Sequence, residues 1–205
     1  MPLQNRVDPF GNLIRTAARG TMMGNRGGVL HNADREIVRA YKSRRWITCV
    51  LEFRGRHRVV MSANLYTELF FLDEAVAFAA GHRPCAECRR ERYNDFKDAW
   101  HLAHRLDESP SADDMDLGLH PARIDQRKKI TYEAALGSLP DGSFVQIQGS
   151  AYLVWRDALM LWTPEGYARR DARPTDSIVT VLTPGPIVEC FRQGYRPEIH
   201  ETARR

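Results

Sequence analysis

The chain has 205 residues, of which 27% are charged, and a formal net charge of +4 at pH 7. This length allows one large or two small domains with a real hydrophobic core, so the fold does not need a metal for its bulk stability. No segment approaches the run of about 18 apolar residues that a membrane-spanning helix needs, and the first residues lack the order of a secretory signal. These features predict a cytoplasmic protein whose four cysteines do not form a disulfide framework.

The positive charge is concentrated in the first half of the chain. Residues 1–105 hold 18 Lys and Arg against 11 Asp and Glu, a net +7, whereas the remainder has a net −3. Because a guanidinium pairs bidentately with phosphate oxygens, this half is expected to contact nucleic acid, with a solvated basic face as the alternative. The arginines assigned to that contact are Arg26, Arg54, Arg56, Arg58, Arg89 and Arg90.

In chain order, the first predicted element is a strand over residues 46–53, where apolar and polar side chains alternate. Residues 58–61 follow a turn at Gly55 and are expected to complete a β-hairpin with it. Cys49 lies at a spacing of two residues from Ile47 and Leu51, and Phe53 continues this spacing, so all four side chains share one face of the predicted strand. We expect this face to point into the core.

Two helices are predicted next. Asp73 is a suitable N-cap for a short helix over residues 74–80, and Gly81 can end it in a left-handed conformation. After Cys88, apolar residues at spacings of three and four predict a longer helix, which ends near Leu106. Its apolar residues are Tyr93, Phe96, Trp100 and Ala103. Residues 107–117 are acidic and rich in turn formers, and are interpreted as a linker.

Beyond the linker, strands are predicted over residues 143–147, 151–155, 158–162 and 177–182, followed by a helix over 186–193 that Gly194 ends. The expected fold class is therefore α+β, with a small antiparallel sheet and helices around a metal site and then a second β-rich module. We place the domains at residues 1–106 and 118–205, with the linker at 107–117.

The metal site is predicted from Pro84-Cys85-Ala86-Glu87-Cys88. Two thiols separated by two residues can both reach one zinc ion at roughly 2.3 Å, which makes this pair half of a tetrahedral site. A redox-active pair and two ordinary buried thiols are the alternatives. Cys190 stands apart in the sequence and is expected to be a buried apolar side chain.

Two arrangements for the remaining ligands fail. His101 and His104 have a zinc-finger spacing, but a helix starting after Cys88 carries His101 about 20 Å along its axis. A zinc deaminase needs a His or Cys ligand followed two residues later by Glu, and no His, Cys49 or Cys190 has one.

The ligands that remain are His31, which follows a glycine-rich turn, and Cys49 in the predicted strand. His57 and Asp34 are substitutes. Together with Cys85 and Cys88, His31 and Cys49 would form a closed structural zinc site with no position left for water. Because Cys49 is expected to point into the core, we expect it to be a shielded ligand rather than a nucleophile.

Residues 68–88 resemble the second half of the Ada-type metal-binding domain, in which a strand, an Ala-rich helix, Gly, an aromatic residue, Arg, Pro and CxxC follow one another. The turn that ends in His31 is also similar to variants of this domain found beside bacterial nucleases. The resemblance covers residues 24–90. It implies a small antiparallel sheet around a four-ligand zinc; in the DNA-repair members, one zinc-bound Cys accepts a methyl group from a DNA phosphotriester.

The sequence thus favours a zinc-binding protein with an Ada-like module that contacts nucleic acid in DNA repair or processing. One alternative is an enzyme, either a methyl-accepting repair protein or one that processes nucleic acid. The other is a protein-interaction scaffold with purely structural zinc. Signatures of P-loop, α/β-hydrolase, zincin and dinucleotide-binding proteins are absent from the sequence.

Overall fold

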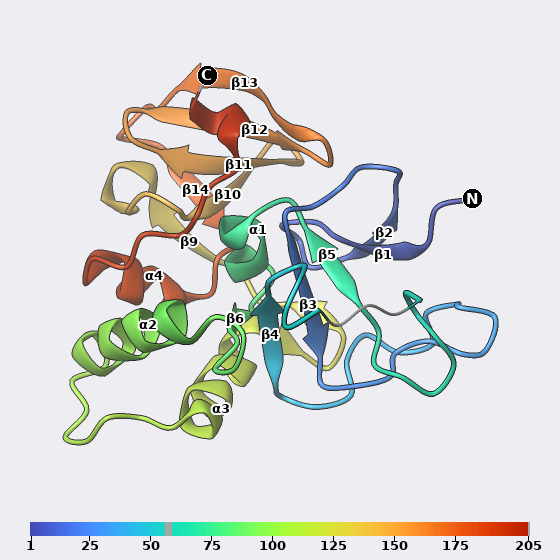
Figure 1. Cartoon of the computed structure of the whole chain (residues 1–205). Coiled ribbons are helices and arrows are strands. Elements are labelled where there is room, and N and C mark those ends of the chain that lie inside the picture. Colours follow the sequence, from blue (N-terminus) through green and yellow to red (C-terminus); the bar gives the residue numbers. More distant parts are fainter. Residues whose placement is uncertain (56–58, 205) are drawn as a thin grey trace.

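The protein is described by a computed structural model that covers residues 1–55 and 59–204 (Figure 1). Those residues form two six-stranded sheets, a two-stranded ribbon and four α-helices, which confirms the α+β class and the second β-rich module. Three helices gather on one side of the molecule, and the short helix α1 lies between the two sheets (Figure 1). No helix in the described part of the chain is long and apolar enough to cross a membrane.

The first sheet has the strand order β2-β1-β5-β3-β4-β6. Its strands are β1 (Gln4–Val7), β2 (Leu13–Arg15), β3 (Met22–Arg26), β4 (Trp46–Cys49), β5 (Leu69–Phe71) and β6 (Arg83–Pro84). The pairings are antiparallel except β1 with β5 and β4 with β6, which are parallel. The sheet is therefore mixed rather than purely antiparallel.

The predicted hairpin after residue 46 is wrong. Strand β4 ends at Cys49 and pairs with β3 and β6, while residues 59–61 form no strand. Strand β3 can pair with β4 because the two backbones approach closely at Gly24: a Cβ on this residue would lie 2.3 Å from the Ile47 carbonyl oxygen. Residues 56–58, with Arg56, His57 and Arg58, lie outside the described residues.

Helix α1 (Glu74–Ala79) has the predicted caps. The Asp73 carboxylate accepts a hydrogen bond from the Val76 N–H at 2.9 Å, and Gly81 has a φ of +86°. All six residues of α1 are buried. A helix that is apolar all round belongs in a protein interior, so α1 forms the layer between the sheets.

The second sheet has the order β13-β12-β11-β10-β14-β9, and all its pairings are antiparallel. Its strands are β9 (Tyr132–Ala135), β10 (Phe144–Ile147), β11 (Ser150–Trp155), β12 (Ala158–Thr163), β13 (Gly166–Ala172) and β14 (Ile178–Val181). The four predicted strands correspond to β10, β11, β12 and β14. Strands β9 and β13 were not predicted, because three of the seven residues of β13 are charged and β9 is partly exposed.

Helices α2 (Arg90–Ala103), α3 (Ala112–Arg123) and α4 (Gly185–Arg192) pack around one apolar cluster. The predicted apolar stripe on α2 lies in this cluster, as does Cys190, which is fully buried.

The linker prediction for residues 107–117 is wrong in part, because α3 begins at Ala112. Ser111 and Asp114 form a capping box that starts this helix, and Met115 buries its apolar face. Three short elements complete the described residues: the ribbon of β7 (Ile124–Asp125) with β8 (Lys128–Lys129), and the 3₁₀ helices Leu136–Ser138 and Glu201–Arg204.

The hydrophobic core crosses the proposed domain boundary. One cluster joins Phe71 and Ala75 from the first half with Phe144, Leu153 and Met160 from the second sheet. The division into residues 1–106 and 118–205 stays a prediction, and the packing joins both parts around α1.

A buried carboxylate at the start of α1 ties the C-terminal segment to the first half. Glu74 is fully buried and accepts hydrogen bonds from Arg89 at 2.8 Å, Arg92 at 2.7 Å and the Tyr195 hydroxyl at 2.7 Å. It also accepts one from the Glu198 N–H at 2.8 Å. A buried charge is stable only when it is paired and hydrogen-bonded in this way.

We predict that Glu74→Gln lowers the free energy of unfolding by about 3 kcal/mol, because it keeps the side-chain size but leaves buried Arg89 with a weaker counter-charge. Denaturant unfolding followed by circular dichroism measures this. Glu91→Gln, at an exposed position of α2, is the control and should change the stability by less than about 0.5 kcal/mol. Equal stability of the two variants would contradict the role assigned to Glu74.

Candidate metal centre

Three cysteines far apart in the sequence meet beside the first sheet. The sulfur atoms of Cys49, Cys85 and Cys88 all lie within 4.8 Å of one another. Two thiolates bound to one zinc at 2.3 Å in a tetrahedron are about 3.8 Å apart, so this spacing is compatible with one shared ion. The three thiols could therefore hold a metal ion.

Parallel pairing of β4 with β6 creates this arrangement. Cys49 is the last residue of β4, and Cys85 directly follows β6, where its N–H donates to the Thr48 carbonyl at 2.9 Å. The chain then turns, and Cys88 lies two residues before α2 begins at Arg90. The strand pairing sets the distance from Cys49 to Cys85, and the turn sets the distance from Cys85 to Cys88.

Hydrogen bonds within the cluster favour a thiolate at Cys85. Bonds from the thiols of Cys49 and Cys88 and from the N–H groups of Glu87 and Cys88 lower the pKa of Cys85 to about 2. The same cluster raises the pKa of Cys49, first because its thiol is hydrogen-bonded to Cys85 and Cys88, and then because it is buried. N–H groups directed at a sulfur support the negative charge that metal ligation requires.

The sulfurs border a cavity of about 580 Å³ rather than a closed core. Its walls are mostly apolar and come from β3, β4, β5 and the segments after β4. Besides the three cysteines, the cavity is lined by Met23, Gly24, Asn25, Gly27, Gly28, Ile47, Val50, Leu51, Phe53, Val60, Tyr66, Glu68, Phe70 and Glu87.

The expected orientation of Cys49 is wrong. Within β4 the buried side chains are Trp46 and Thr48, while Ile47 and Cys49 are partly exposed and line the cavity. The alternation was identified correctly, but the apolar face is not the core face, because large Trp46 packs inward on the other side. The sequence thus selected Cys49 as a candidate ligand and missed the cavity beside it.

His31 does not join the three sulfurs. Its Nδ1 lies 2.6 Å from the Thr67 hydroxyl and its Nε2 lies 3.2 Å from the Ser62 carbonyl oxygen, so both ring nitrogens have other partners. Among the described residues, no His, Asp, Glu or further Cys places a ligand atom within 4.8 Å of all three sulfurs, and this includes Asp34, His101 and His104. His57 lies outside the described residues.

The arginines assigned to nucleic acid are not on one surface patch. Arg26 and Arg89 are buried, at 2% and 6% exposure, and make internal contacts. Arg54 and Arg90 are exposed. Arg56 and Arg58 lie outside the described residues.

Comparisons with protein-family models, with curated proteins and with solved structures gave no match in any of the three cases. The resemblance to the Ada-type domain consequently stays a prediction that these comparisons neither support nor contradict. The described geometry itself provides the three-cysteine cluster and the cavity beside it.

We predict that Cys49→Ser, Cys85→Ser and Cys88→Ser each abolish stoichiometric metal binding, since the site has only these three thiolates. His31→Gln should retain the metal, because its ring makes other contacts. Cys190→Ser is the matched control, because this thiol is buried in a different cluster. Elemental analysis gives the stoichiometry, and the thiolate-to-cobalt absorption of the Co²⁺-loaded protein counts the thiolates; metal loss from His31→Gln would contradict the assignment.

Proposed function

We propose that this protein binds one zinc ion through Cys49, Cys85 and Cys88, and that the bound thiolates react with an alkyl group held in the adjoining cavity. Soft thiolate ligands favour zinc, Cu(I) or iron–sulfur chemistry, and a tetrahedral set of separate thiolates is typical of zinc. The single observation that carries the proposal is that Cys49 faces the cavity of about 580 Å³.

The charge of the site favours nucleophilic chemistry at sulfur. Three thiolates on one Zn²⁺ give a net charge of −1, which makes the metal a weaker Lewis acid and leaves electron density on the sulfurs. A thiolate rather than a thiol is the nucleophile, and metal coordination keeps it deprotonated at neutral pH. Cys49 is the sulfur assigned to this role, because it lies at a strand end with the open cavity beside it.

The proposed reaction is the transfer of a methyl group from a phosphotriester. The Cys49 sulfur attacks the methyl carbon and forms a thioether, while the carbon–oxygen bond breaks and the phosphodiester leaves with the electron pair. No proton is transferred in this step. The apolar walls formed by Ile47, Phe53 and Phe70 suit an uncharged alkyl group. The resemblance to the Ada-type domain, which includes acceptors of this kind, supports the same reaction.

Contact with nucleic acid is part of the proposal and is supported by the net +7 of residues 1–105. Exposed Arg54 and Arg90 are available for phosphate, whereas Arg26 and Arg89 are engaged in internal contacts. The described residues that line the cavity include no Lys or Arg. Phosphate contacts are accordingly assigned to the surface around the cavity rather than to its interior.

A metal-bound water is the alternative chemistry, since three protein ligands leave the fourth position of a tetrahedral zinc open. Purely structural zinc is the other alternative. Both alternatives differ from alkyl transfer in their products. An enzyme that uses a zinc-bound water turns over and leaves its cysteines unmodified, and a structural zinc site gives no reaction.

We predict stoichiometric methylation of Cys49 when the zinc-loaded protein is incubated with DNA that carries methyl phosphotriesters. Mass spectrometry of proteolytic peptides should show one added methyl group on Cys49 and none on Cys190, which is fully buried. Methyl iodide serves as a second donor that reports sulfur reactivity without DNA binding. Cys190→Ser should react like the unmodified sequence, and Cys49→Ser should not react.

Unmodified cysteines after exposure to both donors, with zinc still bound, would contradict alkyl transfer and leave chemistry at a metal-bound water and purely structural zinc as the two remaining functions. Modification by methyl iodide alone would show a reactive thiolate whose substrate is not a DNA phosphotriester.

We also predict that the protein binds duplex DNA at low salt and that Arg90→Ser and Arg54→Ser each weaken this binding. Loss of one phosphate contact should lower the slope of log affinity against log salt by about 0.9. Fluorescence anisotropy at several salt concentrations measures the slope. The control is Arg169→Ser, at an exposed position of β13 in the second half of the chain, and it should leave the slope unchanged. Equal slopes for all four proteins would place the DNA contact elsewhere.

A further inference from the structure

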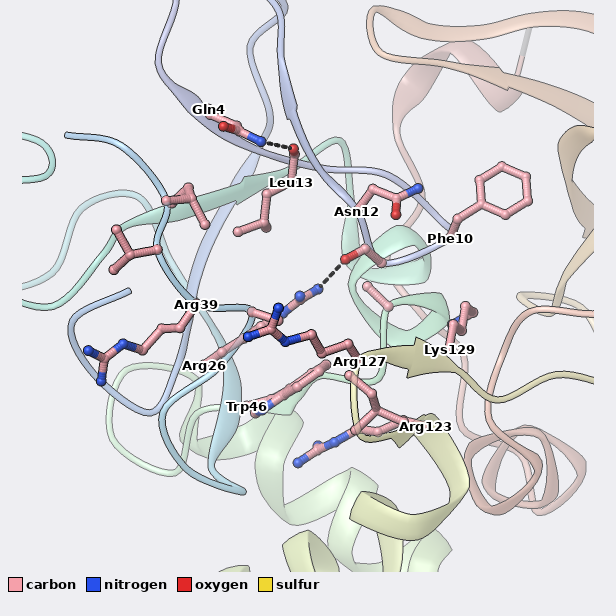
Figure 2. Close-up of a pocket in the computed structure, with 16 residues that line it drawn as sticks. Gln4, Phe10, Asn12, Leu13, Arg26, Arg39, Trp46, Arg123, Arg127 and Lys129 are labelled. Atoms are coloured by element: carbon pink, nitrogen blue, oxygen red, sulfur yellow. Dashed lines mark hydrogen bonds between the residues drawn. The ribbon is translucent and has the colours of Figure 1, made fainter. Parts of the chain in front are cut away.

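Figure 2 shows a second cavity, of about 430 Å³. It lies on the face of β3 and β4 opposite the cysteines. Strand alternation separates the two cavities, because Arg26 and Trp46 line this one, whereas Asn25 and Ile47 line the other. The basic residues of this second cavity are Arg26, Arg39, Arg123, Arg127 and Lys129.

Of the innermost cations, Arg26 and Arg123 are buried and Lys129 is half-buried, and all three contact neutral groups. Arg26 is 2% exposed, and its Nη2 donates to the Gly11 carbonyl at 3.0 Å, the contact drawn in Figure 2. Arg123 is also 2% exposed and donates from Nη1 to the Gly81 carbonyl at 2.8 Å. Its buried Nε has no hydrogen-bond partner among the described residues. Lys129 donates to the Ala79 carbonyl.

In the described part of the chain, these cations have no carboxylate partner. Within residues 1–55 and 59–204, no carboxylate oxygen lies within 4.0 Å of a side-chain nitrogen of any of the five basic residues. Asp8 acts on Arg26 and Lys129 from a distance, but its carboxylate is hydrogen-bonded to Asn12. Asp116 likewise acts on Arg123 from a distance. Its carboxylate forms two bonds to another arginine, Arg83, at 2.6 and 3.1 Å.

The other buried arginines of the protein show that this lack of a partner is unusual here. Arg83 and Arg89 are 3% and 6% exposed, and each forms an ion pair with a buried carboxylate, Asp116 and Glu74 respectively. Arg26 and Arg123 are as deeply buried, and their partners among the described residues are carbonyls, His rings and the Trp46 ring. A buried charge without a counter-ion is costly, so an anion in this cavity would stabilise the protein.

The pKa shifts that burial causes agree with the geometry. Burial, followed by the charge of Arg26, lowers the pKa of Lys129 to about 7. Burial also lowers the pKa of Arg26 and of Arg123 to about 9. The positive charges of this cavity are therefore poorly compensated by the chain itself.

Trp46 holds two of the cations in position. The guanidinium carbons of Arg26 and Arg123 each lie 4.3 Å from a ring centre of Trp46, and the three side chains are layered in Figure 2. Such cation–π contacts fix guanidinium orientation without neutralising its charge. Phe10, Leu13 and Ile37 form an apolar wall on the same cavity, so its lining has a cationic part and an apolar part.

We propose that this cavity binds an organic phosphate, with the phosphoryl group on Arg26, Arg127 and Lys129 and the organic part against the apolar wall. Arg123, on the other side of the Trp46 ring, adds positive charge behind this group without contacting it. A doubly charged phosphoryl group matches several convergent cations, and the guanidinium fork suits its oxygens. The cavity is larger than inorganic phosphate alone requires. A free mononucleotide and the phosphorylated end of a nucleic acid present the same chemistry.

The first experiment measures thermal unfolding and calorimetric binding of the full chain with adenosine 5′-monophosphate, inorganic phosphate and adenosine. We expect the melting temperature to rise with the concentration of the two phosphates, more for the nucleotide, and not with adenosine. No binding of either phosphate at millimolar concentration would overturn the proposal. Equal binding of adenosine and its monophosphate would also overturn it, because the phosphoryl group would then contribute nothing.

Two variants test the assigned residues. Arg127→Gln, at an exposed position on the cavity rim, should fold normally and weaken monophosphate binding about tenfold, as expected for one charge-assisted hydrogen bond. Lys129→Met should lose most of the binding while the ligand-free protein melts no lower, because a poorly compensated charge is removed. Arg105→Gln, exposed and outside the cavity, is the control. A lower melting temperature with unchanged binding in Lys129→Met would show that Lys129 only caps α1, and would overturn its role.

A third comparison distinguishes the source of the phosphate. An oligonucleotide with a 5′-phosphate that binds more tightly than its 5′-hydroxyl form, with the difference lost in Arg127→Gln, would identify a nucleic-acid end as the ligand. Equal binding of the two forms together with tight mononucleotide binding would identify a free nucleotide. Cys49→Ser, on the opposite face of the sheet, should bind adenosine 5′-monophosphate normally, so this proposal is tested separately from the metal centre.

Discussion

The fold depends on two adjacent carboxylates that start a fully buried helix. Asp73 accepts hydrogen bonds from Val76, the Tyr167 hydroxyl and the His200 N–H, and Glu74 binds the arginines of α2 and the C-terminal segment. Because buried carboxylates are stable only with several donors, both sheets and the chain end must assemble around α1. Strand β6 follows α1 in the chain and pairs with β4, which brings Cys85 beside the end of β4.

The alternation of side chains along β3 and β4 gives this sheet two chemically different faces. On one face, Cys49 and Ile47 border an apolar cavity with three sulfurs. On the other, Arg26 and Trp46 border a cavity with five basic residues. A single residue shift in either strand would exchange the faces, so the register of β3 with β4 decides which chemistry each cavity has.

The buried arginines serve two distinct purposes. Arg83 and Arg89 pair with Asp116 and Glu74 and thereby join α3 and α1 to their neighbours. Arg26 and Arg123 are fixed by carbonyls and Trp46, which orients them but leaves their charge uncompensated. Stability accounts for the first pair, and ligand binding is the proposed reason for the second.

The sequence by itself determined the local features. The caps of α1, the apolar stripe of α2, four of the six strands of the second sheet, the burial of Cys190 and the pairing of Cys85 with Cys88 in one candidate metal site follow from short-range spacing and turn chemistry. Only the tertiary structure decided the partners of β4, the direction in which Cys49 faces, the other contacts of His31 and the separation of buried from exposed arginines. Alternation shows that two faces exist, but which of them is buried depends on strands and helices from distant parts of the chain.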